Sequence, residues 1–273
     1  MSDLVIISKE AKALGGGLNG FREALQRHIL RSLAAGGFFD EMAFVGGTAL
    51  RIGHQLNRFS EDLDFAVLQP MSVDRMIEIG DTAFEALKKL KVGISSERDF
   101  RTIPMGGLTD KLDYVCHLDV RLPPEFRNGG ANRFTLRLDV DRNPANGWKM
   151  TPMLIRSKSR PFALTMHDLP SLFAGKLHVL CCRVDRAKGR DFFDLAWYLS
   201  REVSPNLDFL DATIQGLETK PWPVSEWRDR LVKRLDEVNF DRLLRELEPY
   251  LIEPADAMLL NRQVFVSAIG QID

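Results

Sequence analysis

Apolar and polar residues follow two different periods in the first half of the chain. A period of three to four residues predicts amphipathic helices at residues 21–35 and 72–90. A period of two, or a short apolar run, predicts strands at residues 42–45, 62–67, 112–120 and 134–141. Gly46 and Gly47 end the first of these strands, and a helical pattern follows at residues 48–55. The pattern therefore predicts a small sheet flanked by helices.

Only the helical period remains in the second half of the chain. Helices are predicted near residues 168–184, 189–200, 207–217, 224–251 in two pieces and 255–270. Asparagine, proline and glycine residues punctuate the chain between Asp141 and Thr165, which indicates a domain boundary there. We therefore expect an α/β (α+β) fold, with a mixed or antiparallel sheet in a domain at residues 1–160 and a helical domain at residues 161–273.

Composition is typical of a soluble globular protein and excludes several other classes. Of the 273 residues 45% are hydrophobic and 27% are charged, and the net charge is -1. This balance gives no global field toward nucleic acid or a membrane, so a polyanion site must be a local patch. No stretch approaches the ~18 apolar residues of a membrane helix and no signal peptide is evident, so we expect a cytoplasmic protein. The cysteines Cys116, Cys181 and Cys182 form no C-x-x-C pair, and we interpret them as small buried hydrophobic residues.

The first candidate for chemistry is the segment FVGGTALRIGHQLNRFSEDLDF at residues 44–65. Gly46 and Gly47 at a strand end permit positive φ and a close approach of the backbone, so main-chain N–H groups and the next helix N-terminus can face phosphate oxygens. Thr48 adds a hydroxyl at the same place, and Arg58 and Ser60 lead into the acidic residues that follow. This combination predicts a phosphate-binding turn.

Two acidic residues on the next strand complete this unit. Asp62 and Asp64 project from the same face, so their carboxylates are close together, which is unfavourable unless a cation is present. Such a pair could share two magnesium ions roughly 4 Å apart. A two-metal site needs a further carboxylate, and Asp139 or Asp141 offers it from a later strand, of which we favour Asp139. The segment therefore predicts a metal-dependent site for a nucleoside triphosphate.

The second candidate is the stretch of residues 167–199. Lys176 falls within the apolar stripe of its predicted helix, and a lysine there is aimed either at water or at an anion in a cleft between domains. We favour a phosphate partner. Arg190, Asp191 and Asp194 begin the next helix, where an Arg190 to Asp194 pair and acids in the first turn have a simpler interpretation as helix stabilisation that braces Lys176.

With both stretches in hand, the sequence resembles the AbiEii/AbiGii toxin family of nucleotidyltransferases, a branch of the DNA polymerase beta superfamily. The matching motifs are G-G-T-A-L at 46–50, R-F-S-E-D-L-D-F at 58–65, L-R-L-D-V at 136–140 and the blocks K-L-H-V-L-C-C-R and R-D-F-F-D-L between 176 and 195. The resemblance implies that Asp62, Asp64 and Asp139 are catalytic and hold Mg²⁺ or Mn²⁺. The nucleotide-binding residues that we expect are Gly46, Gly47, Thr48, Arg58, Ser60, Lys176, Arg190, Asp191 and Asp194.

What the resemblance implies for function is the toxin of a bacterial toxin–antitoxin or phage-defence system. Such a toxin would transfer a nucleoside monophosphate from an NTP to an acceptor, with the 3′ end of tRNA as the acceptor we expect and a cognate antitoxin as a partner. The helical domain would complete the nucleotide cleft. A tRNA acceptor needs a positive surface, and basic residues that could supply it are Lys149, Arg156, Lys158, Arg160, Arg183, Arg186 and Lys188.

Other functions fit parts of the same pattern. A glycosyltransferase also uses an Asp-x-Asp pair, but it does not require a glycine turn and a hydroxyl one helix upstream. A non-catalytic RNA-binding or partner-binding module has no chemical need to keep three carboxylates together. A nucleotidyltransferase that modifies a protein or a small molecule is the strongest alternative, and the sequence does not separate these acceptors.

Overall fold

The computed structural model describes residues 3–103, 111–127, 132–157, 160–182 and 187–272, with the side chains of residues 100–103, 111 and 112 left aside. A seven-stranded mixed sheet has the strand order β3-β4-β5-β2-β1-β7-β6. Its strands are β1 (Met42–Val45), β2 (Leu63–Val67), β3 (Ile94–Ile103), β4 (Lys111–Arg121), β5 (Arg133–Asp141), β6 (Met150–Ile155) and β7 (Phe162–His167). The pairs β2–β5 and β1–β7 are parallel, and the other neighbours are antiparallel.

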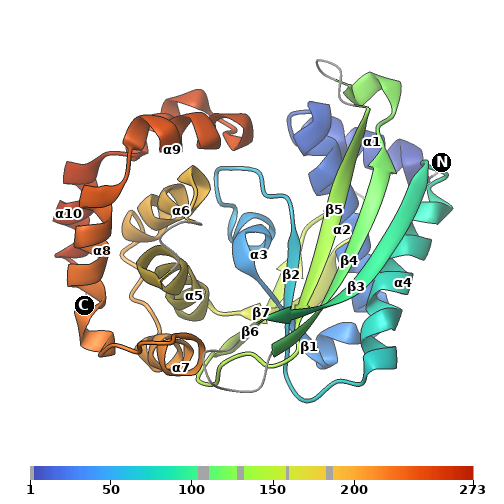
Figure 1. The fold of residues 1–273 in the computed structure, drawn as a ribbon. Coiled ribbons are helices and arrows are strands. Elements are labelled where there is room, and N and C mark those ends of the chain that lie inside the picture. Colours follow the sequence, from blue (N-terminus) through green and yellow to red (C-terminus); the bar gives the residue numbers. More distant parts are fainter. Residues whose placement is uncertain (1–2, 104–110, 128–131, 158–159, 183–186, 273) are drawn as a thin grey trace.

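Helices cover the two faces of this sheet. The helices before the last strand are α1 (Asp3–Ala13), α2 (Gly17–Ala35), α3 (Gly46–His54) and α4 (Val73–Lys89). Figure 1 shows α2 and α4 on one face, and α3 on the opposite face beside the helical part of the chain. The core on the α2 and α4 face is aromatic, since Phe65 of β2 lies 5.7 Å from Phe44 of β1 and 6.2 Å from Phe39, measured between ring centroids.

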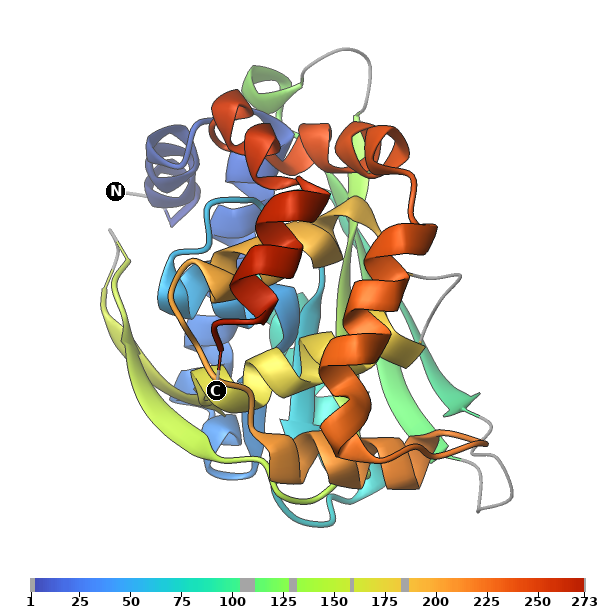
Figure 2. The ribbon, with the colours of Figure 1, turned by 90° about the vertical axis from the view of Figure 1, so that its left-hand side faces the viewer.

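After β7 the chain is helical. The helices are α5 (Leu169–Cys182), α6 (Gly189–Leu199), α7 (Leu207–Leu217), α8 (Trp227–Glu237), α9 (Phe240–Leu247) and α10 (Arg262–Ile269). Short 3-10 helices lie at η1 (Phe38–Asp40), η2 (Pro124–Phe126), η3 (Val224–Glu226), η4 (Glu248–Tyr250) and η5 (Pro254–Leu259). Figure 2 shows the helical layer α5–α10 in front of the sheet, and Figure 1 shows α5 and α6 between the sheet and α8 and α10. Of the described helices, not one is long and apolar enough to cross a membrane.

The sheet continues past the boundary expected at residues 160 and 161. β7 pairs with β6 and, in parallel, with β1 through Phe44 and Met166. The hairpin was not predicted because Pro152 and Pro161 punctuate this stretch, but β6 is an edge strand, where a missing backbone N–H is tolerated. β3 was missed as well, because this edge strand has a polar sequence without apolar alternation.

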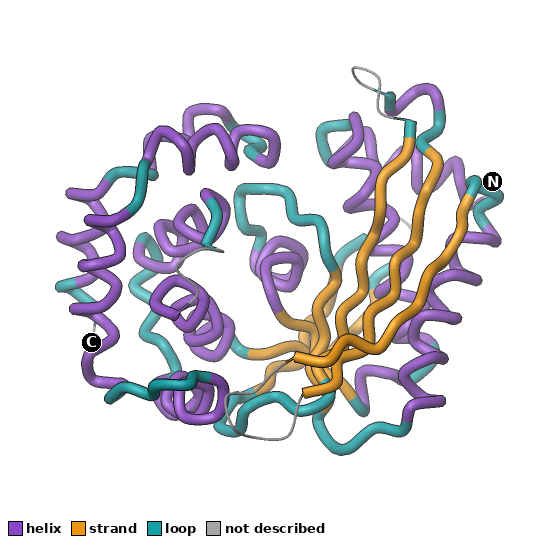
Figure 3. Tube along the Cα trace, in the orientation of Figure 1, coloured by secondary structure: helices purple, strands orange, loops and turns teal. Residues whose placement is uncertain are grey.

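The loop between α3 and β2 runs between the sheet and the helical layer, as the teal trace in Figure 3 shows. This loop contains Arg58, Ser60, Glu61 and Asp62. Arg58 forms an isolated bridge with Leu251, and the Phe59 N–H donates to the Tyr250 carbonyl at 2.8 Å. The segment that leads into the acidic strand is therefore attached to the C-terminal part of the chain.

Candidate active site

A glycine turn joins β1 to α3 directly beside β2. Gly46 has φ 77°, and a Cβ atom there would overlap the Asp64 carboxylate. A Cβ at Gly47 would lie 2.9 Å from Arg58 Nη2 and 3.1 Å from Ser60 Oγ. The two glycines therefore let the turn pack against the acidic strand on one side and the α3–β2 loop on the other, and they leave the N-terminus of α3 beside Asp64.

The acidic residues lie on neighbouring parallel strands. Asp64 of β2 is in register with Val45 of β1 and with Asp139 of β5, and Asp62 precedes β2. Burial together with the nearby Asp62 and Asp139 raises the pKa of Asp64 to about 7. Burial is also the main reason that the pKa of Asp62 is raised. This part of the sheet therefore places negative charges where protein and solvent compensate them poorly.

Arg137 holds the third carboxylate. Its Nε donates to Asp139 Oδ1 at 3.0 Å, and its Nη2 pairs with Asp139 Oδ2 at 2.5 Å. Asp141 lies two residues further along β5, lines the adjoining cavity and accepts the Asn143 N–H at 2.9 Å. The register with Asp64 favours Asp139 as the third member of the group. The ligand atoms of these three carboxylates are farther apart than those of His178, Cys182 and Glu218, which lie within 4.8 Å of one another.

Thr48 and Ser60 have different positions. Thr48 is fully buried, and its hydroxyl donates to the Asp62 carbonyl, so it fixes the backbone at the start of β2. Ser60 is partly exposed and faces Gly47, and its carbonyl accepts a hydrogen bond from the buried side chain of Gln26 at 3.2 Å. Gln26 was not singled out from the sequence, since its position in an amphipathic helix carries no local signal of this long-range contact.

Arg58 and Lys176 meet at Asp194. Arg58 is 1% exposed, and its Nε and Nη2 each donate to one Asp194 oxygen at 2.7 Å. Lys176 Nζ pairs with Asp194 Oδ2 at 2.8 Å and with Asp191 Oδ1 at 2.5 Å. Burial by itself would lower the pKa of Lys176, but the charges of Asp191 and Asp194 outweigh it, so the pKa is raised. Lys176 is therefore a cation held in place by two carboxylates.

Asp191 supports this network from the start of α6. It accepts the Lys188 N–H at 2.9 Å, which caps the helix. Burial acts to raise the pKa of Asp191, but the Lys176 charge and hydrogen bond exceed that effect, so the pKa is lowered. The acid therefore stays ionised in a buried place.

The four-residue spacing of Arg190 and Asp194 predicted an ion pair between them, but the structure does not contain this pair. Arg190 Nη1 instead pairs with Glu61 Oε2 at 3.0 Å, because Asp194 is already occupied by Arg58 and Lys176. Glu61 also accepts the Tyr250 hydroxyl at 2.8 Å and lies 3.3 Å from Arg22 Nη1. Glu61 joins three segments next to Asp62, and it was missed from the sequence because its partners are distant along the chain.

A cavity of about 280 Å³ adjoins the glycine turn. Its polar lining includes Gly46, Gly47, Asp64, Lys176 and Asp141. Most of the other lining side chains are apolar, and they come both from the sheet part of the chain and from the helices after β7. They include Leu50, Ala66, Pro144, Leu172, Val179, Tyr198, Phe209 and Leu217. His167 also lines the cavity, and burial lowers its pKa to about 4, so the imidazole is neutral. The cavity is thus lined by both charged and apolar side chains.

The carboxylate groups beside the glycine turn fit a hard divalent cation. Its ligands are carboxylate oxygens alone, which is what Mg²⁺ and Mn²⁺ prefer. The raised pKa of Asp64 is a second sign, because nearby positive charge would relieve the like-charge repulsion among the acids. Residues that would hold such a cation are Asp62, Asp64 and Asp139. An acidic strand, a glycine turn at a helix N-terminus and an adjoining cavity lined by charged and apolar side chains are the parts that a nucleotidyltransferase requires.

Comparison with known proteins agrees with this class. The model of the family described as "Nucleotidyl transferase AbiEii toxin, Type IV TA system" matches residues 28–262. The chain therefore belongs to the AbiEii family of nucleotidyltransferases of type IV toxin–antitoxin systems.

Two crystal structures from Helicobacter pylori are similar to the chain. One is of a candidate nucleotidyltransferase, at 24% identity and a TM-score of 0.44, and covers 92% of this chain and 96% of its own. The other is of JHP933, at 23% identity and a TM-score of 0.45, and covers 92% of each chain. The search of curated proteins gave no match.

Proposed function

We propose that this protein is a metal-dependent toxin that transfers a nucleoside monophosphate from an NTP to the 3′ hydroxyl of tRNA. The observation that carries the proposal is the position of Asp64. It lies against the Gly46–Gly47 turn, in register with Asp139, and it lines a cavity whose other lining residues include many apolar side chains. A triphosphate needs charged surroundings and a nucleobase needs apolar ones, and this cavity has side chains of both kinds.

Each part of the site has a distinct task in this proposal. The backbone of Gly46 and Gly47 and the N-terminus of α3 bind the triphosphate, and the apolar side chains that line the cavity contact the nucleobase. Lys176 faces the same cavity and contributes positive charge near the phosphates. Thr48, Arg58, Ser60, Asp191 and Asp194 position these groups. Arg190 lies with Glu61 beside Asp62, and it counters the charge of that acid.

Asp62, Asp64 and Asp139 would hold Mg²⁺ or Mn²⁺, and the bound cation would lower the charge of the triphosphate and favour ionisation of the acceptor hydroxyl. Asp139 is the base that we assign to the hydroxyl proton. The acceptor oxygen forms a bond to the α-phosphorus, the bond from that phosphorus to the β-phosphate oxygen breaks, and pyrophosphate leaves in line. The apolar side chains that line the cavity exclude water from the nucleobase.

A polyanionic acceptor is supported by exposed basic residues. Lys149, Arg156, Arg160 and Lys188 are exposed, whereas Lys158, Arg183 and Arg186 lie outside the described residues. We further propose that the protein acts in the cytoplasm, where tRNA and NTPs are found, and that a cognate antitoxin restrains it.

The test is transfer of label from each α-labelled NTP to total tRNA in the presence of Mg²⁺. We expect label on tRNA with the wild type and at least a 100-fold loss, roughly the cost of one transition-state group, with Asp64→Asn. Asp119→Asn is the matched control, because Asp119 is an exposed strand acid on β4, away from the cavity. Label on a protein or a small molecule would keep the chemistry and replace the acceptor. Label that persists in Asp64→Asn would overturn the assignment of the site.

A further inference from the structure

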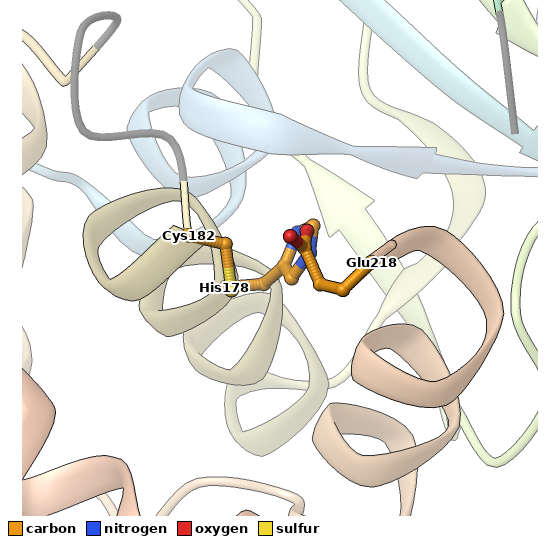
Figure 4. A group of neighbouring side chains, drawn as sticks. All are labelled: His178, Cys182 and Glu218. Atoms are coloured by element: carbon orange, nitrogen blue, oxygen red, sulfur yellow. The ribbon is translucent and has the colours of Figure 1, made fainter. Parts of the chain in front are cut away.

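A second cluster of metal-ligating side chains lies on α5 and next to the end of α7, two helices that also line the cavity. Figure 4 shows His178 and Cys182 on α5 together with Glu218, the capping residue directly after α7. His178 and Cys182 are four positions apart and so lie on the same helix face. One ligand atom of each of the three residues lies within 4.8 Å of the others, and His178 Nε2 is 2.8 Å from Glu218 Oε1.

The chemistry of these donors is that of a zinc ligand set. An imidazole nitrogen, a thiolate and a carboxylate are the three ligand types that zinc accepts, whereas Mg²⁺ and Ca²⁺ take oxygen donors. His178 is buried, and Glu218 has a side-chain exposure of 26%, so an ion could enter from the side of Glu218. The Trp222 side chain also hydrogen-bonds to the Cys182 sulfur, which is an outer-shell contact that a thiolate ligand can use.

We propose that His178, Cys182 and Glu218 form a zinc site, with water as the fourth ligand. The ion would fasten the end of α7 to α5. Val179 and Leu217, which are the next residues to His178 and Glu218, line the nucleotide cavity, so the ion would fix the spacing of that apolar wall. The inference does not depend on the acceptor or on the reaction, since the ligands are separate from Asp62, Asp64 and Asp139.

The alternative is a plain hydrogen bond between His178 and Glu218, with Cys182 as a neighbour. Cobalt separates the two, because tetrahedral Co²⁺ gives visible absorption and a thiolate ligand adds a near-ultraviolet charge-transfer band. The full chain is stripped with a chelator, reduced, and titrated with Co²⁺ in excess Mg²⁺, which occupies oxygen sites. We expect one Co²⁺ per chain with the charge-transfer band, and displacement of that ion by Zn²⁺.

Cys181→Ser is the matched control for Cys182→Ser. The Cys181 thiol points to the Trp227 carbonyl at 3.8 Å instead of to the cluster. Cys182→Ser should lose the band and bind the ion more weakly by more than the roughly 10- to 100-fold that loss of an outer-shell partner costs, while Cys181→Ser keeps both. Glu218→Gln should also weaken binding, although it can still hydrogen-bond to His178.

X-ray absorption of the wild-type zinc protein keeps the test independent of how the variants fold. One sulfur at about 2.3 Å, with nitrogen and oxygen neighbours at about 2.0–2.2 Å, is the expected shell. A zinc shell without sulfur, a failure to bind Co²⁺, or an equal effect of the two cysteine variants would each overturn the proposal.

Discussion

Asp64 holds a carboxylate where burial and two neighbouring acids oppose its charge. Its pKa is raised from 3.8 to about 7 in the folded protein. Between these pH values the folded chain binds more protons at this group than the unfolded chain does, so the free energy of unfolding falls as pH rises from about 4 to about 7. The charge of Asp64 thus weakens the fold at neutral pH, as expected of a carboxylate whose charge only a bound cation would compensate.

Asp64→Asn should therefore stabilise the protein at pH 7.5 in EDTA. A gain on the order of 1 kcal/mol would raise Tm by about 2–4 °C in a chain of this size, and the gain should shrink as pH falls and vanish below about pH 3, where Asp64 is protonated in both states. Thermal unfolding of both proteins across this pH range measures it. Mg²⁺ should raise the Tm of the wild type but not of the variant, and Asp119→Asn should match the wild type throughout. A lower Tm for Asp64→Asn in EDTA at pH 7.5 would contradict the proposed repulsion.

Gly46→Ala tests the close approach of the turn to the same carboxylate. A Cβ atom would overlap Asp64, so we expect lower transfer activity in addition to a loss of stability of about 1–3 kcal/mol. Gly16→Ala is the matched control, since Gly16 has φ 69° and no heavy atom within 4 Å of a Cβ. Urea unfolding and the transfer assay compare the two variants. If they behave alike, backbone strain explains the effect and the Asp64 contact does not.

At the scale of elements, local pattern predicts what a segment forms and seldom what it meets. The strand–turn–helix unit at residues 42–55 was predicted because its apolar run, glycines and helical spacing are all local. The bond from Arg58 to Asp194 spans 136 positions and has no such signal. Lys176 was predicted to face a phosphate and to be braced by the start of the next helix, and in the structure it pairs with Asp191 and Asp194 of that helix. The network thereby joins the α3–β2 loop to α5 and α6.

Asp194→Asn should destabilise the fold by about 3–5 kcal/mol, because it leaves Arg58 buried without its carboxylate. The amide is close to the same size, so packing is preserved and charge is the main change. Urea unfolding measures the loss. Glu226→Gln, at the end of η3 and just before α8, is the comparison, since Glu226 pairs with Arg230 at the surface and should change stability by about 0.3–0.5 kcal/mol. An equally small change at Asp194 would mean that the buried ion pair contributes little.

At the scale of the whole molecule, the fold class and the family were predicted from sequence motifs. The last hairpin of the sheet and the contacts of the C-terminal segment were not. The acidic strand and the stretches of residues 44–65 and 167–199 could be recognised because each is contiguous in the sequence. The β6–β7 hairpin that completes the sheet was hidden by its prolines, and the attachment of the C-terminal segment to the α3–β2 loop depends on long-range contacts. His178 and Cys182 have a visible four-residue spacing, but Glu218 lies 40 positions from His178, so the cluster became apparent only in three dimensions.

Glu61 is the residue through which the N-terminal helices, the acidic strand and the C-terminal segment meet. It forms ion pairs with Arg22 of α2 and Arg190 of α6 and accepts the Tyr250 hydroxyl of η4. A hydrogen bond to a charged group contributes about 1.5–3 kcal/mol at most, and less here because the Glu61 side chain is 29% exposed. Glu61→Gln should open the contact locally rather than unfold the chain. We expect amide exchange to become about 10-fold faster both in α2 and near η4.

Hydrogen exchange with mass spectrometry measures this opening, and Glu78→Gln, in an exposed pair with Arg75, is the control that should change neither region. The same substitution removes a negative charge that raises the pKa of Asp62, so Asp62 should ionise at lower pH and the variant should bind Mg²⁺ at least as well as the wild type. Faster exchange confined to the α3–β2 loop would show that Glu61 only shapes its own segment. Faster exchange in α2 and near η4 with Mg²⁺ binding retained would show that one side chain both holds the molecule together and tunes the acid next to it.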